Sequence, residues 1–325
     1  MIDTALILAA GLGTRLAPLS HVRAKAALPV AGEAIIRRQV RWLAAAGVRH
    51  VIVNLHHLPA TVTAVLGHGD DLGVTVRYSW EPHVLGSAGG PRQAFDLVDA
   101  ARLVVVNGDT LADLDLAALV REHARTPRLV TMAATAARAG YNALRLDASG
   151  ALIGVRRAGA HAATAAGDEE LAHFMGVQVV ERRAFAEVPT STPTETVKWL
   201  YPRLAAADPS SVRLWRHAAS FFDVGTPAEY LRTVQVVAAR EGRRLDRGAN
   251  TLVDTSADVT GSVLWNDVRV GAGASVHDCV LADGVVVPAG MRVSRSAVVR
   301  GDSAPDARGE RRGDLLVVPF DAASR

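Results

Sequence analysis

Apolar runs of strand length alternate with helix-like stretches from residue 4 to about residue 240. Several of these runs are apolar on both faces, as strands are when they are buried in a mostly parallel sheet. The alternation therefore predicts an α/β fold with helices on both faces of the sheet. Ligands in such folds bind at the carboxyl ends of strands, so the loops near Gly11, Asn107 and Glu181 are candidate site loops. The expected strands are 5–9, 51–55, 74–78, 103–106, 129–133 and 174–180, and the expected helices are 33–46, 59–66, 88–98 and 115–125.

A 17-residue repeat replaces this alternation after about residue 242. Residues 263–279 read VLWNDVRVGAGASVHDC and residues 280–296 read VLADGVVVPAGMRVSRS, so that Val270 matches Val287. Small apolar residues about every six positions, with Gly and Pro at corners, are typical of triangular β-helix coils, which stack because one coil cannot bury its apolar face alone. A set of antiparallel hairpins is the alternative. The predicted domains are 1–242, then 243–303 with about three coils, and a tail over 304–325 in which 315–320 has the pattern of a last strand.

The composition excludes several classes of protein. The 325 residues carry a net charge of +3 with scattered arginines, whereas nucleic-acid proteins concentrate charge on one face, so we expect no nucleic-acid partner. A single cysteine, Cys279, leaves no internal disulfide and fits a reducing cytoplasm. No apolar run approaches the roughly 18 residues of a membrane span. Because Asp3 stands where a signal peptide would be basic, we expect a first strand there and a cytoplasmic location without a membrane partner.

Lysine is almost absent from the chain. Of 36 basic residues only Lys25 and Lys198 are lysines. Either the two positions are accidental in a chain that otherwise uses arginine, or a compact ammonium is needed there rather than a planar guanidinium.

The first candidate loop carries two glycines and two cations. Gly11 and Gly13 allow close approach of the backbone to a ligand, and successive N–H groups in such a loop can hold phosphate oxygens. A dinucleotide-binding loop needs a third small residue where Leu16 stands, and the Gly-Lys-Ser/Thr of a P-loop is absent. Arg15 can clamp phosphate with two hydrogen bonds, and Lys25 lies in an apolar segment where an anionic partner would offset its burial.

These residues together resemble one family. LAAGLGTRLAPL followed by K-x-x-L-P-V resembles the signature of sugar-1-phosphate nucleotidylyltransferases, which join a nucleoside triphosphate to a sugar 1-phosphate and release pyrophosphate. The resemblance covers about residues 4–240 and implies a Rossmann-like sheet of the nucleotide-diphospho-sugar transferase type with Mg²⁺ as cofactor. The C-terminal coils resemble the left-handed hexapeptide β-helix of several branches. One departure is Ala24, where the family usually has Pro before the lysine.

The resemblance implies a set of nucleotide-binding residues. Glu81 and the segment LGSAGG resemble the family loop over the nucleobase, although Ser87 also fits the cap of a helix. Arg15 and Lys25 would draw the charge of the triphosphate toward the leaving group. The full set is Leu8, Ala9, Ala10, Gly11, Gly13, Thr14, Arg15, Lys25, Glu81, Gly86, Ser87 and Gly89.

It also implies residues for the sugar phosphate and the metal. Asn107 and Asp109 resemble the family's metal-binding strand end, although Asn-Gly and Gly-Asp are also common turn pairs. Lys198 stands four residues before Pro202, as the family lysine that holds the sugar phosphate does. Pro227 fits the first position of a helix. The implied sugar-phosphate residues are Asn107, Tyr141, Asn142, Gly176, Glu195 and Lys198, the metal ligands are Asp109 and Asp223, and the catalytic set is Arg15, Lys25, Asp109, Lys198 and Asp223.

Three functions fit these observations. The first is an NDP-sugar synthase, and the segments NLHHLP, EPHVLGSAGG and FMGVQVV favour the mannose-1-phosphate guanylyltransferase and muramate-phosphate uridylyltransferase branches. GTP with a manno-configured sugar 1-phosphate is the preferred pair, and UTP or dTTP is the alternative. The second is a homologue that binds nucleotide sugars without catalysis. The third is a β-helix acyltransferase using His277, although a lone His on a coil is more often structural. Stacked coils often pack against another subunit, so we expect a homodimer or larger oligomer.

Overall fold

The computed structural model describes residues 2–125, 127–157, 169–245, 247–304 and 307–320. The chain divides into two compact units. The domain boundaries near residues 242 and 303 stay a prediction, because these units are defined by packing, whereas a domain is defined by independent folding. Unit 1 comprises Met1–Gly11, Gln39–His56 and Gly67–Phe221, and unit 2 comprises Leu12–Arg38, His57–Leu66 and Phe222–Arg325.

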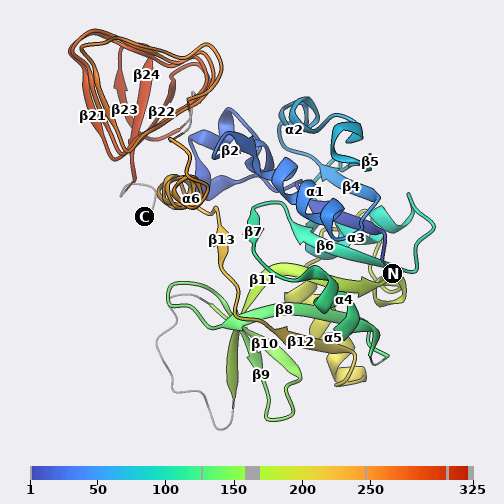
Figure 1. Ribbon diagram of the computed structural model, residues 1–325. Helices are drawn as coiled ribbons and strands as arrows, with labels where there is room; N and C mark the ends of the chain where they lie inside the picture. The colour runs from blue at the N-terminus through green and yellow to red at the C-terminus, as the bar shows by residue number, and fades with distance from the viewer. Residues whose placement is uncertain (1, 126, 158–168, 246, 305–306, 321–325) are drawn as a thin grey trace. The chain divides into compact units, whose positions relative to one another are not determined.

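Unit 1 is built on a nine-stranded sheet whose main path runs β10-β9-β11-β6-β1-β4-β5 (Figure 1). Four strands at one side of the path are parallel and rich in the β-branched residues that suit a pleated sheet: β1 (Thr4–Leu8), β4 (His50–Leu55), β5 (Thr75–Trp80) and β6 (Arg102–Asn107). The long strand β11 (Glu170–Glu181) runs antiparallel to β6. The remaining strands are β8 (Val130–Ala136), β9 (Ala143–Leu146), β10 (Leu152–Arg156) and β12 (Val212–Arg216).

Helices cover this sheet and enclose its core. α3 (Gly86–Phe95) packs on β1 and β4, α4 (Leu116–Ala124) packs on β8 and β11, and α5 (Tyr201–Ala207) packs on β10 and β12. Leu6, Ile52 and Phe95 are fully or almost fully buried in the resulting core. All six predicted strands and all four predicted helices occur with small shifts at their ends, so the predicted fold class is confirmed. The other two predicted helices are α1 (Ile35–Ala45) and α2 (Pro59–Leu66).

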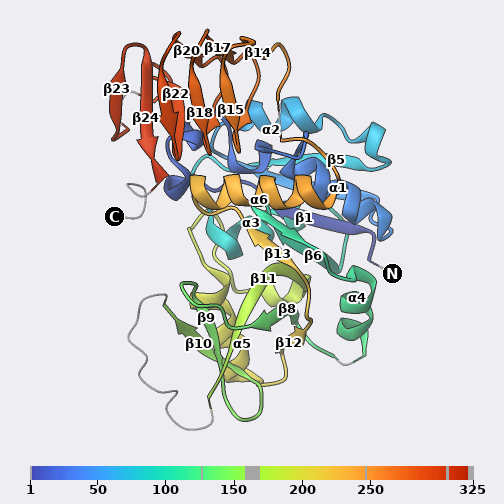
Figure 2. The same ribbon diagram turned by 60° about the vertical axis from the view of Figure 1, so that its left-hand side comes forward.

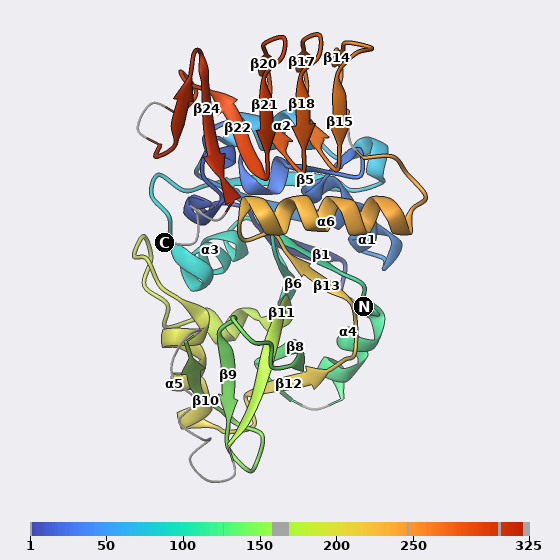
Figure 3. The same cartoon turned by 90° about the vertical axis from the view of Figure 1, so that its left-hand side faces the viewer.

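Unit 2 contains the β-helix, whose coils are seen end-on in Figure 1 and from the side in Figure 3. Its strands form three parallel ladders, and every partner along the chain is 17 residues away, as in Val253, Val270 and Val287. The parallel ladders exclude the antiparallel hairpins. The ladders are β14 (Leu252–Val253), β17 (Arg269–Val270) and β20 (Val286–Val287), then β15 (Asp258–Thr260), β18 (Ser275–His277) and β21 (Arg292–Ser294), and finally β16 (Val263–Leu264), β19 (Val280–Leu281) and β22 (Ser296–Arg300).

Residues assigned to a tail by sequence contribute to the β-helix. β24 (Leu315–Pro319) pairs antiparallel with β22, and β23 (Glu310–Arg312) pairs with β24. Leu315 and Val317 pack into the apolar core of the coils. The strand pattern seen at 315–320 therefore corresponds to β24, while residues 305–306 and 321–325 of the expected tail lie outside the described residues.

The long helix α6 (Pro227–Arg240) lies beside the coils within unit 2 (Figures 2 and 3). It begins with Pro227, as predicted, and the Thr226 hydroxyl caps it by accepting a hydrogen bond from the Glu229 N–H at 3.2 Å. The Gln235 amide donates to the Gly261 carbonyl at 2.9 Å, which ties α6 to the first coil. Within the described part of the chain, no helix is long and apolar enough to cross a membrane.

Candidate functional site

The first predicted loop leaves the carboxyl end of β1 in unit 1. Ala9 and Ala10 are buried, and Gly11 is exposed. The Leu8 carbonyl accepts a hydrogen bond from the Gly108 N–H at 2.9 Å, which brings the ends of β1 and β6 together. The loop therefore starts at the sheet edge where ligands of α/β folds bind.

A buried polar relay connects this loop to the loop predicted to cover the nucleobase. Asn54, at the end of β4, accepts a hydrogen bond from the Ala9 N–H at 2.7 Å and donates one to the Glu81 carboxylate at 2.7 Å. The other oxygen of Glu81 accepts from the Leu85 N–H at 2.8 Å. Glu81 is fully buried, so its carboxylate shapes this loop from the inside. No sequence motif predicted these hydrogen bonds of Asn54.

The nucleobase loop runs directly into α3. Gly86 has φ +80°, and a Cβ there would stand 2.5 Å from the Thr194 carbonyl oxygen, so only glycine fits. Ser87 lies inside the helix and not at its cap, which corrects the capping alternative. Its hydroxyl accepts a hydrogen bond from the Thr196 N–H at 2.9 Å and also contacts the Glu195 carboxylate at 3.2 Å. Gly89 is buried on the same helix.

The turn after β6 carries the predicted metal carboxylate Asp109. Its neighbour Asn107 ends the strand, and β7 (Thr110–Ala112) begins directly after it. The amide of Gln39, which is almost fully buried, donates to the Asn107 and Thr110 carbonyls, both at 2.7 Å. This double contact fixes the turn and with it the backbone that carries Asp109. Nothing in the sequence pattern of α1 distinguished Gln39 from an ordinary polar residue.

Predicted sugar residues lie around the bulge in β11. Gly176 has φ +74°, and a Cβ there would stand 2.4 Å from the Thr110 hydroxyl, so its lack of a side chain permits close packing. His173 stacks edge-on with Tyr141 at 5.3 Å and shares a hydrogen bond with the Asn142 carbonyl at 3.3 Å. Burial lowers the pKa of His173, so the ring is neutral near pH 7.

Lys198 lies inside a π-helical turn (Thr196–Leu200) that precedes α5, and Glu195 directly precedes this turn. Both side chains are exposed. Such turns often occur at functional positions, and this one presents the Lys198 ammonium to solvent. The hydrogen bonds of Ser87 to Glu195 and Thr196 join the turn to the nucleobase loop within unit 1.

The remaining predicted residues belong to unit 2. Gly13 lies against the side chains of Ser20 and Lys25, and Thr14 and Arg15 lie in a 3₁₀ turn (Thr14–Leu16). The Arg15 guanidinium lies beside Gly225, where a Cβ would stand 3.1 Å from one of its nitrogens. Unit 2 thus gathers the cations predicted for the triphosphate next to the segment after β13 (Phe221–Asp223).

Lys25 and Asp223 form a charged pair in unit 2. Lys25 Nζ lies 3.8 Å from Asp223 Oδ1, and the side chains are 16% and 23% exposed. Partial burial reduces screening by water, so the pair interacts more strongly than two surface charges. A triphosphate and a cation can replace this contact, because each partner would then have a new opposite charge.

The donor chemistry of Asp109 and Asp223 fits a hard divalent cation. Each carboxylate is half-buried and lies at or just after a strand end. Among the described residues, no group of three or more His, Cys, Asp or Glu could hold a metal ion. Taken by itself in its own unit, each carboxylate lacks a complete protein cage and suits an ion that keeps waters and phosphate oxygens in its coordination shell.

His277 lies among its own neighbours in the described coils of the β-helix. Its Nε2 contacts both Asp258 Oδ2 at 2.8 Å and Ser275 at 3.2 Å. Because the same nitrogen makes both contacts, the ring is not arranged as in a Ser-His-Asp triad, where one nitrogen faces the serine and the other is held by the aspartate. Burial raises the pKa of the Cys279 thiol to about 11, so that thiol stays protonated and inert.

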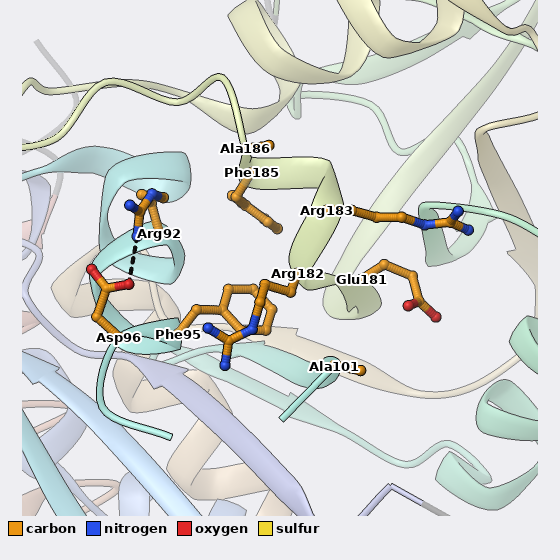
Figure 4. A pocket seen from close by; sticks show the side chains of 9 residues that line it. All are labelled: Arg92, Phe95, Asp96, Ala101, Glu181, Arg182, Arg183, Phe185 and Ala186. Atoms are coloured by element: carbon orange, nitrogen blue, oxygen red, sulfur yellow. Dashed lines mark hydrogen bonds and ion pairs between the residues drawn. The ribbon is translucent and has the colours of Figure 1, made fainter. Parts of the chain in front are cut away.

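A cavity of about 480 Å³ lies elsewhere in unit 1 (Figure 4). It opens beside Ala101 and Glu181, where β6 begins and β11 ends. Because β11 runs antiparallel to β6, the loop near Glu181 lies at the sheet edge opposite the loops near Gly11 and Asn107, so the expectation that these three loops share one edge is wrong. The Arg182 guanidinium lies 5.2 Å from the centre of the Phe95 ring, and Arg92 is held by a carboxylate one turn along α3. None of the predicted site residues lines this cavity.

Both the α/β part of the chain and its C-terminal coils match known protein families. Residues 4–145 match the nucleotidyl transferase family model, and residues 247–302 match the model of the GlmU-like C-terminal hexapeptide. A mannose-1-phosphate guanylyltransferase of Mycobacterium tuberculosis is 29% identical over 303 residues, which cover 91% of this chain and 82% of the relative. An N-acetylmuramate alpha-1-phosphate uridylyltransferase of Neisseria meningitidis is 37% identical over 128 residues, which cover 39% of this chain and 55% of the relative.

A solved structure shows the same fold. The crystal structure of HddC from Yersinia pseudotuberculosis superimposes with a TM-score of 0.61 at 19% identity and covers 73% of this chain and 100% of that chain. The chain therefore combines a nucleotidyl transferase domain with a GlmU-like hexapeptide domain, and over most of its length it is similar to a mannose-1-phosphate guanylyltransferase.

Proposed function

We propose that the protein transfers the nucleotidyl group of GTP to mannose 1-phosphate, or to a related manno-configured sugar 1-phosphate, and releases pyrophosphate. The contact of Lys25 with Asp223 carries the catalytic part of this proposal, because it places an ammonium and a carboxylate beside the Gly13 loop. The similarity to a mannose-1-phosphate guanylyltransferase over 91% of the chain supports the substrate pair.

We assign the recognition of base and sugar phosphate to unit 1. The backbone of Gly86 and Gly89 would read the edge of the base, in the loop that Glu81 and Asn54 hold. Tyr141, Asn142 and Gly176 would contact the sugar. The exposed ammonium of Lys198 would hold the attacking phosphate.

We assign charge neutralisation of the triphosphate to Arg15 and Lys25. During transfer, an oxygen of the sugar phosphate attacks the α-phosphorus, the bond to the β-phosphate oxygen breaks, and pyrophosphate leaves with the electron pair. No covalent bond to the protein is needed, so these side chains contribute by positioning and by stabilising the developing charge. Asp109 and Asp223 would hold Mg²⁺, which supplies Lewis-acid stabilisation of phosphate oxygens when bound.

A uridylyltransferase or thymidylyltransferase is the second candidate. The 37% identity to a uridylyltransferase over 128 residues favours UTP within that class. The choice depends on loop backbone around Gly86, which recognises base edges without a charged side chain and can therefore serve either base.

Steady-state kinetics with each of the five NTPs and mannose 1-phosphate would test the proposal. We expect kcat/KM to be at least tenfold higher with GTP than with UTP or dTTP. A higher value with UTP or dTTP would assign the protein to the second candidate. Binding of nucleotide sugars without turnover of any pair would instead identify a non-catalytic homologue.

A further inference from the structure

The segment that carries Lys25 is held in an unusual way. The family pattern that this segment resembles has proline before the lysine, and here Ala24 is fully buried with φ −57°, a value that proline would also adopt. The Ala24 N–H donates to the Thr61 hydroxyl of α2 at 3.0 Å, and proline could not make this hydrogen bond. Local stiffness from proline is thus replaced by contacts from elsewhere in unit 2.

The strongest of these contacts comes from the β-helix. Arg23 forms a two-pronged pair with Asp283, with Nε to Oδ2 at 2.7 Å and Nη2 to Oδ1 at 2.6 Å. The two side chains are 14% and 29% exposed. Asp283 lies in the turn between β19 and β20, and it also accepts a hydrogen bond from the Asn266 N–H of the preceding coil at 3.0 Å. Planar, charge-assisted pairs of this kind fix orientation as well as distance.

A tryptophan of the β-helix also contacts the Arg23 guanidinium. We call Asp283 and Trp265, which hold Arg23 together, the clamp. Arg23 lies over the Trp265 ring, 5.1 Å from its centre, and Trp265 is almost fully buried. The Trp265 indole N–H donates to the Tyr230 hydroxyl at 3.0 Å, and that hydroxyl donates to the Pro29 carbonyl at 2.6 Å. The chain is therefore held two residues before Lys25 and four residues after it, and both restraints lead to Trp265.

We propose that Asp283 and Trp265 are positioning residues for catalysis, which act on Lys25 through Arg23. The β-helix would then set the geometry of the ammonium that meets the triphosphate, beyond any part it has in assembly. The inference rests on the proposed function, since it takes Lys25 to be the phosphate-binding lysine. It concerns contacts within unit 2 alone.

Activity of Asp283→Asn tests the proposal against a matched control. Glu241→Gln removes a similar two-pronged pair, because Glu241 binds Arg38 at 2.6 and 3.0 Å in the same unit. Arg38 meets the backbone at the Val30 and Ala31 carbonyls, which lie beyond the restraint at Pro29. We expect Asp283→Asn to lower kcat/KM for the NTP by about 10- to 100-fold, as small misplacements of catalytic groups do, with KM for the sugar phosphate unchanged. Glu241→Gln should stay within twofold of wild type. Equal losses in both variants, or none in Asp283→Asn, would overturn the proposal.

A second variant distinguishes loss of the Arg23–Asp283 pair from misfolding of the Asp283→Asn protein. Arg23→Gln breaks the same pair from the other side and also removes the contact with Trp265. The double variant Arg23→Gln with Asp283→Asn should lose no more than Arg23→Gln alone, because the contact of Asp283 with the guanidinium is already gone in that variant. Additive losses would show that the two residues act independently and would contradict the clamp.

The lysine content gives a readout that does not depend on activity. Protein grown with ¹³C,¹⁵N-lysine carries label at Lys25 and Lys198 only, and a Lys198→Arg sample assigns the two side-chain NMR signals. Asp283→Asn should shift or broaden the Lys25 signal and leave the Lys198 signal in place, while Glu241→Gln should move neither. An unmoved Lys25 signal would reject the clamp even if the enzyme is active. A moved signal in a protein that turns over no substrate would reject the proposed function and leave the clamp standing.

Discussion

At the scale of single residues, the proposed function depends on two ammonium groups. Lys25 and Lys198 are the only lysines in a chain with 36 basic residues, and both coincide with positions that the family resemblance assigns to phosphate. We expect Lys25→Arg and Lys198→Arg each to reduce kcat by about 10²–10³-fold, because a planar guanidinium cannot occupy the place of a compact ammonium. Circular dichroism and thermal unfolding should match wild type.

Arg232→Lys, on the exposed side of α6, is the control for exchanging the two cations. It should retain full activity. Near-wild-type turnover of both lysine variants would contradict their roles at the phosphates.

Among the candidate site residues, local structure was predictable only where a motif fixes the backbone. Gly13 and Gly86 could be placed in turns from the sequence, because each has a positive φ that other residues rarely adopt. Asn54 and Gln39 could not, since their importance comes from hydrogen bonds to segments far along the chain. Ser87 fits a helix cap by sequence, but the helix begins one residue earlier and its hydroxyl bonds the Thr196 backbone instead.

At the scale of elements, periodicity identified what is buried on both faces. The parallel strands of unit 1 and the 17-residue coils were both predictable, because burial forces their apolar pattern. β9, β10 and β12 were not, since they are short and carry charged residues such as Arg145 and Arg216 along their length. The roles proposed for residues next to these strands rest on the family resemblance and not on periodicity.

One buried histidine joins three of these elements and predicts a pH dependence. His123 of α4 contacts Thr131 of β8 at 2.9 Å and Glu181 of β11 at 3.2 Å. Burial lowers its pKa below 6.5, although Glu181 partly opposes the shift. Below pH 6.5 the unfolded chain therefore binds a proton that the folded protein does not. The free energy of unfolding should fall with decreasing pH until the folded pKa is reached, by at most about 1.4 kcal/mol per pH unit.

Urea unfolding between pH 7.5 and 5.0 would measure this slope. In His123→Gln the slope should be smaller than in wild type, because the titrating group is gone. An identical slope in the variant would assign the effect to other groups.

The coils should be as sensitive to cavities as any close-packed core. Leu281 of β19 is fully buried, and Val286 of β20 is 54% exposed. We expect Leu281→Ala to reduce the free energy of unfolding by about 2–5 kcal/mol and Val286→Ala to change it by less than about 0.5 kcal/mol. Similar effects of the two substitutions in denaturant unfolding would contradict the inward and outward orientation of these strands.

At the scale of the whole molecule, the outer face of one ladder favours association. Leu252 and Val286 are 61% and 54% exposed, and they flank Arg269 in consecutive coils. Exposed apolar side chains on a rigid face are typical of protein contacts, so we expect a homodimer or larger assembly. Light scattering coupled to gel filtration should give a mass at least twice the 34.2 kDa of one chain. A monomeric mass at micromolar concentration would refute this expectation.

The proposed function requires that this chain itself transfers a nucleotidyl group to a sugar 1-phosphate. The most direct test follows α-³²P-labelled GTP with mannose 1-phosphate and magnesium, and measures pyrophosphate in the same reaction. We expect one labelled nucleotide sugar for each pyrophosphate released, and we expect neither product when the sugar phosphate is omitted. Absence of turnover with all five NTPs and a panel of sugar 1-phosphates, in protein that is folded and binds nucleotide, would contradict it.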